Sequence, residues 1–179
     1  MIGDRDLIER CLAGELAAFD EIVGRYQDAL YRHLLRLAGG REQAEDLCQE
    51  AFVKFYRALP SFDRTRPVAP FLFTIATNAW RDSRRPRLTL VTNEEVAADD
   101  PGPESVVFDL LARQEILAAM AGLREEYREV LSLRYDQGLS YREIAEVTGI
   151  TTGTVSTWLR RAVGALREAL QVAGMEAAR

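Results

Sequence analysis

Apolar residues recur at intervals of three and four along most of the chain, which is the spacing of one face of an α-helix. This pattern predicts helices over residues 4–13, 16–38, 42–59, 70–85, 104–121 and 124–135. Gly39 and Gly40 follow the second of these helices, as expected where a helix ends. No segment alternates apolar and polar residues convincingly, as a half-buried strand would. The sequence therefore predicts an all-α fold.

Residues 139–166 predict a helix, a tight turn and a second helix. Ser140 is placed to cap the first helix, and Glu143 lies three residues later, at the spacing of a capping box. Gly149 lies where this helix must stop and reverse. Such a stop requires a left-handed backbone conformation, which glycine adopts without steric cost.

The second helix of this segment, which Thr151 or Thr152 can cap, has one apolar and one polar side. Small polar residues and an arginine occupy the polar side near its start: Thr152, Gly153, Ser156, Thr157 and Arg160. Such a surface at the N-terminal end of a second helix suits insertion into the major groove of DNA. We therefore interpret residues 139–166 as a helix-turn-helix motif rather than as a plain helical hairpin in a bundle.

The predicted helix 70–85 places aromatic residues beside a basic and amide-bearing face. Phe73 and Trp80 lie seven residues apart on one flank of this helix. The adjoining face carries Thr74, Thr77, Asn78, Arg81, Arg84 and Arg85. Such a face could hold single-stranded nucleic acid, with arginines on phosphates and aromatic rings stacked on bases. The alternative is that the two aromatic residues complete the core and the arginines are simply solvated.

The predicted helix 42–59 has an apolar face and an outward face that is not uniformly polar. The outward face carries Asp46, Gln49, Glu50, Val53 and Arg57. A single exposed valine is ordinary in a folded protein, so Val53 gives only a hint of a contact surface. Three prolines follow this helix, at positions 60, 67 and 70, and predict a non-helical loop.

Residues 86–103 show no helical periodicity and are predicted to form a flexible linker between two domains. Acidic residues gather in and beside this segment: Glu94, Glu95, Asp99, Asp100 and Glu104. These five carboxylates match the formal net charge of −5, so the remainder of the chain is close to neutral. Because nucleic-acid attraction depends on local charge, the net charge does not exclude DNA binding, although we expect the free chain to bind DNA weakly.

Several classes of function find no support in the sequence. No run of about twenty apolar residues predicts a membrane span, and the N-terminal residues do not resemble a signal peptide. Cys11 and Cys48 form no CxxC pair, and His33 is the single histidine, so neither a metal site nor a cofactor is expected. We expect Cys48 to be a small buried hydrophobic residue, His33 an ordinary helical residue, and a reducing cytoplasm the setting. No nucleotide-binding or nucleophile motif indicates an enzyme.

Three segments together resemble bacterial RNA polymerase sigma factors of the extracytoplasmic-function (ECF) group in the sigma-70 superfamily. AEDLCQEAFVKFYRAL at 44–59 is similar to the signature DAEDLxQExF. PFLFTIATNAWRDSRR at 70–85 resembles the segment that recognises the −10 promoter element. Residues 123–168 resemble the domain that recognises the −35 element, and the whole resemblance runs from about residue 18 to 170.

This resemblance implies two small helical domains with different tasks. Sigma domain 2, at 1–88, would bind core polymerase and the −10 element, and sigma domain 4, at 105–179, would bind the −35 element. An acidic linker at 89–104 would join them. The implied partners are core RNA polymerase, through its clamp and flap regions, promoter DNA and an anti-sigma factor, without membrane insertion. The implied function is to recognise promoters and promote DNA melting so that transcription of a specific regulon begins.

The resemblance also assigns residues to each contact. The residues that would bind core polymerase are Asp46, Gln49, Glu50, Val53 and Arg57. Those that would meet the −10 element, some of them around a flipped base, are Ser61, Phe62, Asp63, Phe71, Thr77, Asn78, Trp80, Arg81, Arg84 and Arg85. Those that would meet the −35 element are Ser140, Tyr141, Thr151, Thr152, Gly153, Thr154, Ser156, Thr157, Arg160 and Arg161.

Two departures from the family pattern affect these assignments. Phe71 stands where the family usually has tryptophan, which keeps an aromatic ring in the −10 segment. Residues 155–159 read Val-Ser-Thr-Trp-Leu where V-K-S-R-L is common, so two positive charges are missing. Fewer phosphate contacts predict a shallower salt dependence of DNA binding, and Trp158 is expected to pack against the core rather than touch DNA.

A second hypothesis is a stand-alone helix-turn-helix regulator with an N-terminal sensor domain. A sensor would need a ligand cavity, or a phosphate-accepting aspartate after a strand, and the N-terminal half of the sequence predicts neither.

Overall fold

The computed structural model describes residues 2–84 and 116–177. In order, these residues form α1 (Asp4–Leu12), α2 (Leu16–Ala38), α3 (Arg41–Ala58), the 3₁₀ turn η1 (Leu59–Ser61), α4 (Val68–Arg84), α6 (Glu125–Leu131), the π-helical turn η2 (Ser132–Asp136), α7 (Tyr141–Thr148) and α8 (Thr152–Ala177). A short helix at 116–121 precedes α6. The described residues contain helices and no strand, which confirms the predicted all-α class. The predicted linker, its acidic residues and Arg85 lie outside the described residues.

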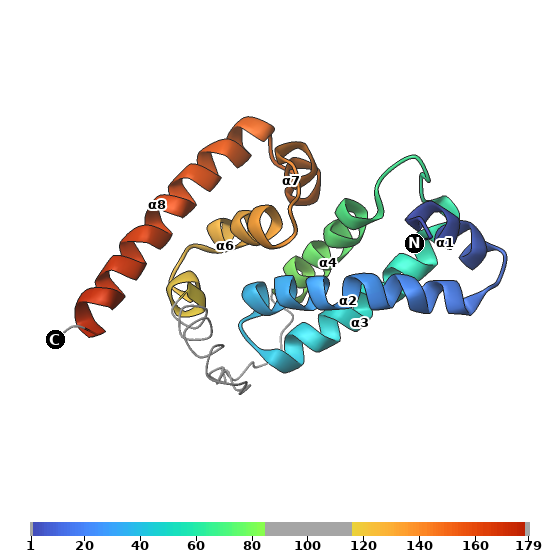
Figure 1. The fold of residues 1–179 in the computed structure, drawn as a ribbon, viewed down its shortest axis with the longest axis horizontal. Coiled ribbons are helices and arrows are strands. Elements are labelled where there is room, and N and C mark those ends of the chain that lie inside the picture. Colours follow the sequence, from blue (N-terminus) through green and yellow to red (C-terminus); the bar gives the residue numbers. More distant parts are fainter. Residues whose placement is uncertain (1, 85–115, 178–179) are drawn as a thin grey trace.

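The N-terminal unit, which we define as residues 2–84, is a bundle of α1 to α4 (Figure 1). Residues spaced three and four apart bury one face of each helix, because that spacing returns to the same side after each turn. Ile22 and Leu34 of α2, Phe55 of α3 and Leu72 of α4 are among its fully buried side chains. The buried cysteines, Cys11 and Cys48, are free thiols, which confirms the packing role predicted for Cys48.

The C-terminal unit, residues 116–177, packs α6, η2, α7 and the first part of α8 together. Val130, Leu133, Ile144 and Val155 are fully buried in its core. Helix α8 lies on the outer side of this unit, away from α4 (Figure 1). In the polar first turns of α8, Thr152, Gly153 and Ser156 are exposed.

The predicted residues cap both ends of α7 and the start of α8 in the helix-turn-helix. The Ser140 hydroxyl accepts a hydrogen bond from the Glu143 backbone N–H, and the Glu143 carboxylate accepts one from the Ser140 N–H at 2.8 Å. Gly149 ends α7 in the left-handed conformation, with φ 74°. Of the two candidate caps for α8, it is Thr151 whose hydroxyl accepts from a first-turn N–H, that of Thr154, at 3.2 Å.

Replacing two glycines of the C-terminal unit by alanine should change stability in opposite directions. Gly149→Ala is expected to lower the free energy of unfolding by about 1–2 kcal/mol, because an L-residue is strained at positive φ. Gly164→Ala lies inside α8, where an added Cβ meets no atom within 4 Å, and should raise it by about 0.5–1 kcal/mol. Urea unfolding of both variants measures the difference; equal effects would contradict the left-handed cap.

Three predicted segments differ from the structure. Helix α4 begins at Val68, so Pro70 lies within its first turn. Backbone N–H groups in the first turn have no intrahelical acceptor, so the N–H that proline lacks is not needed there. Pro60 lies within η1, so the non-helical part of the predicted proline-rich loop shortens to 62–67. The helix predicted over 124–135 changes at Ser132 from α6 to the wider π-helical turn η2.

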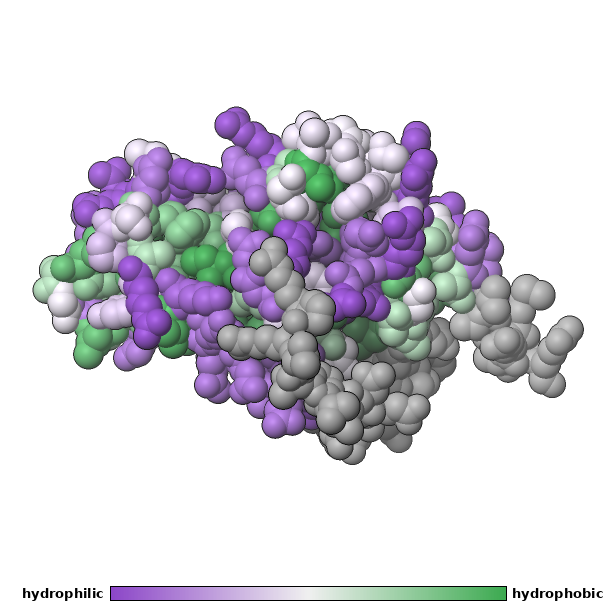
Figure 2. Space-filling model, turned by 180° about the vertical axis from the view of Figure 1, so that it is seen from behind, coloured by the Kyte–Doolittle hydropathy of each residue, from purple (hydrophilic) through white to green (hydrophobic). Residues whose placement is uncertain are grey.

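The two units pack against each other. Helix α4 lies against α7, while α2 lies against α6 and η2, so the last turns of α2 and α4 enter the contact (Figure 1). Seen from behind, the outer surface is largely hydrophilic, with hydrophobic areas that are separated from one another (Figure 2). No helix among the described residues is long and apolar enough to cross a membrane.

Candidate nucleic-acid and protein interfaces

The outward face of α3 is open to solvent along its length. Its predicted contact residues are all exposed, and they are Asp46, Gln49, Glu50, Val53 and Arg57. Val53 is 49% exposed and the neighbouring Tyr56 is 42% exposed. On this face the carboxylate of Glu50 forms an exposed ion pair with Lys54 at 2.7 Å. The face therefore combines an accessible apolar centre with charged residues on both sides.

The loop between α3 and α4 is held by short-range hydrogen bonds around an aromatic cluster. The Asp63 carboxylate accepts hydrogen bonds from the N–H and hydroxyl of Thr65 at 2.9 and 2.7 Å, which hold the pKa of Asp63 below its ordinary value. The Phe62 and Phe71 rings lie 4.8 Å apart beneath it. Ser61 and Asp63 are exposed, whereas Phe62 is buried and Phe71 is half-buried.

The predicted −10 face of α4 is divided between exposed and buried residues. Asn78 and Arg84 are exposed, whereas Thr77 is fully buried and Trp80 is 1% exposed. Phe73 is likewise 1% exposed. Both aromatic residues pack in the core, as one of the two interpretations predicted. The other half of that interpretation, that the arginines are simply solvated, was wrong, because Arg81 pairs with Glu129 and Arg84 with Glu125. A role of Trp80 at DNA stays a prediction.

The predicted −35 surface gathers at the start of α7 and α8. Most of its residues are exposed, and they are Ser140, Tyr141, Thr151, Thr152, Gly153, Ser156, Arg160 and Arg161. Thr154 and Thr157 are half-buried, and the Thr157 hydroxyl donates to the Gly153 carbonyl at 3.0 Å. Trp158 is also half-buried and packs against the core, which confirms the packing role predicted for it.

His33 is fully buried where the two units meet. Its Nδ1 lies 3.0 Å from the Ser132 hydroxyl and its Nε2 lies 3.3 Å from the Thr77 hydroxyl. Burial lowers the pKa of His33 to about 3, and the nearby arginines act in the same direction. The imidazole is therefore neutral, with one nitrogen donating and the other accepting.

Glu129 is a buried charged group at this contact, at 3% exposure. The Arg81 Nη2 lies 2.9 Å from its Oε1 and 3.1 Å from its Oε2. Burial raises the pKa of the Glu129 carboxyl above its ordinary value, although the Arg81 guanidinium acts in the opposite direction. The Arg81 Nη2 also donates to the Thr148 carbonyl at 3.3 Å, which ties α4 to the end of α7.

Comparison with known proteins identifies both units. A family model described as Sigma-70 region 2 matches residues 22–87, and one described as Sigma-70, region 4 matches residues 113–166. The chain is 33% identical over 177 residues to the ECF RNA polymerase sigma factor SigW of Bacillus subtilis, a match that covers 92% of this chain and 95% of SigW. The chain belongs to the ECF sigma factors.

Other relatives of this ECF sigma factor agree. It is 36% identical over 171 residues to the ECF RNA polymerase sigma factor BldN of Streptomyces coelicolor, and spans 65% of that protein's length. A solved structure of CnrH, in complex with the cytosolic domain of CnrY, covers 94% of this chain and 97% of its own, with a TM-score of 0.71 and 27% identity. Promoter recognition and transcription initiation are therefore the activities of this sigma factor.

Sequence reasoning about this sigma factor missed the polar groups between its units. In the sequence, nothing distinguishes Glu129 from an ordinary exposed acidic residue of a helix. Its partner Arg81 lies 48 residues earlier. An open surface depression of about 300 Å³ between α2 and α3 was missed as well; its lining residues are Gln27, Asp28, Tyr31, Glu45, Cys48 and Gln49. Among the residues that the structure describes, no cluster of histidine, cysteine and acidic side chains could hold a metal ion.

Proposed function

We propose that this sigma factor binds core RNA polymerase through the outward face of α3. The observation that carries the proposal is the exposed Val53, which is flanked by Asp46 and Glu50 while the opposite side of the same helix is buried. An apolar centre with a charged rim is the usual anatomy of a protein contact. Gln49 and Arg57 extend the same face in both directions along the helix.

Promoter DNA would meet two separate surfaces. Residues of α4 and the preceding loop would hold the −10 element, with Asn78 and the arginines Arg81, Arg84 and Arg85 supplying polar and cationic groups. The first turns of α8 would read the −35 element from the major groove. Polymerase would hold both units at a fixed separation, so two weak contacts would add through effective concentration. An anionic chain can then serve as a promoter reader.

The protein would act in the cytoplasm, where polymerase and DNA are found, and would not be an enzyme itself. Its task would be to select the promoter and assist melting, while polymerase carries out RNA synthesis. We also propose an anti-sigma factor as a regulatory partner. The support for it is the likeness to CnrH, which was solved in complex with the cytosolic domain of CnrY.

In-vitro transcription with purified core polymerase on genomic fragments tests this function. Addition of the sigma factor is expected to produce transcripts from a small set of fragments, and their starts would define the promoter sequence. Free sigma factor should bind the same duplex fragments poorly at physiological salt, because each of its DNA contacts is weak alone. Tight specific binding without core, together with no transcripts, would instead favour a stand-alone helix-turn-helix regulator.

A further inference from the structure

His33 of α2 contacts both units through the two nitrogens of its ring. Its Nδ1 lies 3.0 Å from the Ser132 hydroxyl of the C-terminal unit, and its Nε2 lies 3.3 Å from the Thr77 hydroxyl of α4. The ring packs edge-on against the Phe73 ring, with centroids 5.3 Å apart. Parting of the two units would therefore remove Ser132 from the ring and open its Nδ1 edge to water.

The closed contact does not accommodate a positive charge on this ring. His33 is fully buried, and a buried charge is costly unless an opposite charge lies beside it. The two polar partners of the ring are neutral hydroxyls, which accept hydrogen bonds but carry no charge. An imidazolium in this position would lose its hydration without an opposite charge to replace it.

The charged groups around His33 add to this effect. Arg36, three residues later in α2, and Arg81 of α4 both act to lower its pKa. The carboxylates that the C-terminal unit brings to this region are already paired: Asp136 of η2 with Arg36, and Glu129 of α6 with Arg81. Among the described residues, α1 and α3 bring no charge that acts on the ring. The contact therefore offers a protonated His33 two like charges.

Protonation of His33 and closure of the contact thus oppose each other. Burial lowers the pKa of His33 to about 3 in the closed contact, whereas an imidazole open to water has a pKa of about 6.5. Because the pKa is lower in the closed state, the stability that the neutral ring gives the contact is fully present above about pH 6.5 and is lost as the pH falls toward 3. Between pH 7.5 and 5.5 the ratio of parted to closed molecules should rise about tenfold.

We propose that His33 makes the contact between the two units sensitive to acid: protonation of its imidazole parts the units, and loss of that proton lets them close. This inference does not depend on what either unit binds. His33 is the single histidine of the chain, and histidine is the side chain that ordinarily titrates just below neutral pH. By linkage, a partner that holds the units apart would bind this chain more tightly in acid.

Glu129 titrates in the opposite sense. Burial raises the pKa of its carboxyl in the closed contact, so protonation of Glu129 favours closure. Carboxyl groups ordinarily titrate at about pH 4, below the range of an exposed imidazole. Opening through His33 is therefore expected between about pH 5 and 6.5. A variant without His33 keeps every carboxylate, so it separates the contribution of the imidazole from theirs.

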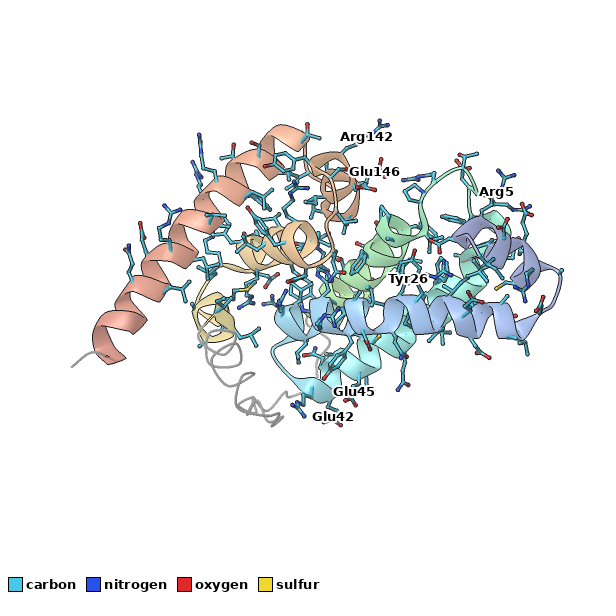
Figure 3. All side chains as sticks on the ribbon, viewed as in Figure 1. Arg5, Tyr26, Glu42, Glu45, Arg142 and Glu146 are labelled. Atoms are coloured by element: carbon cyan, nitrogen blue, oxygen red, sulfur yellow. The ribbon has the colours of Figure 1, made fainter. Side chains whose placement is uncertain are left out.

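Energy transfer between two fluorescent dyes measures the distance between the units in the full-length protein. The dyes are attached at Arg64→Cys, in the loop before α4, and at Arg142→Cys, on α7 (Figure 3), and both positions are exposed. An ion pair between this loop and α7, at 2.7 Å, holds the two segments together. The native Cys11 and Cys48 are buried, and burial raises the pKa of both thiols, so the dyes should react with the introduced cysteines.

Proton NMR follows the ring itself, because the untagged chain has a single histidine. Energy transfer should be high at pH 7.5 and fall with a midpoint between about pH 5 and 6.5, and the midpoint of His33 protonation should coincide with it. Circular dichroism should stay unchanged over this range. Protonation of His33 without a fall in transfer would overturn the proposal, and so would a contact that stays closed down to about pH 5. Both measurements keep the native histidine, so they decide the matter even if variants of His33 do not fold.

The variant His33→Gln then assigns the response, because glutamine is polar but does not titrate. With the same dyes it should keep high energy transfer down to about pH 5. Adding Gln27→His to this variant supplies a histidine at an exposed position of the same helix, and it should not restore the response to acid. A fall in transfer in His33→Gln with the midpoint of the unchanged protein would assign the response to the carboxylates and refute the role of His33.

Discussion

Changing both Asp46 and Glu50 to lysine is expected to abolish co-purification with core RNA polymerase. Both carboxylates are exposed beside Val53 on α3, so a docked partner should present complementary cationic groups there. Like-charge juxtaposition across an interface costs several kcal/mol, and every 1.4 kcal/mol weakens binding about tenfold. A loss of at least about 100-fold in affinity for core is expected, measured by titration of fluorescently labelled sigma factor.

A matched control separates docking from general charge. Asp6→Lys with Asp20→Lys makes the same change in charge at exposed positions of the same unit, on α1 and α2. This control should bind core normally. Both double variants should keep the thermal midpoint of the unchanged protein within a few degrees, because surface substitutions seldom alter stability strongly. Normal binding of core by the α3 variant would show that the docking assignment is wrong.

Arg81→Ala should reduce open-complex formation far more than it reduces binding to core. Arg81 lies on α4 within the predicted −10 face, whereas the proposed docking residues lie on α3. Loss of a charge-assisted phosphate contact should lower the yield of open complexes by about tenfold or more, since such hydrogen bonds contribute about 1.5–3 kcal/mol. Permanganate footprinting of promoter DNA with reconstituted holoenzyme measures the effect, and Arg84→Ala should act in the same direction.

The matched variant for this experiment is Arg5→Ala. Arg5 is exposed on α1, where it forms an exposed ion pair with Glu9 at 3.3 Å. It should leave both core binding and melting unchanged. If Arg81→Ala lowered core binding and open-complex formation equally, the loss would lie in docking, and the −10 role of Arg81 would be contradicted.

Most of the fold could be predicted from local patterns in the sequence. The Ser140 cap and the Gly149 stop were predictable because a capping box and a left-handed cap are determined within a few residues. The exposed position of Val53 was predictable because helical periodicity fixes which side of α3 is buried. The start of α4 was not, because a proline in a first turn and a proline in a loop look alike in sequence.

The contact between the units could not be predicted in the same way. His33 is separated from Ser132 by 99 positions, and Arg81 from Glu129 by 48. Each residue taken alone fits an ordinary solvated position on a helix. Only the packing of α4 on α7 and of α2 on α6 makes these groups buried partners. Thr77 is buried beside His33 of α2 and Asn78 is exposed, although both lie on one predicted polar side.

Because Arg81 and Glu129 belong to one chain, the fraction of molecules that form this ion pair does not depend on protein concentration. Both partners are always present in equal number and at the same effective concentration, whatever the level of synthesis. Producing more of the chain therefore increases the number of molecules without changing the fraction whose arginine is free. An ion pair between two separate chains would weaken on dilution, whereas this pair within one chain does not.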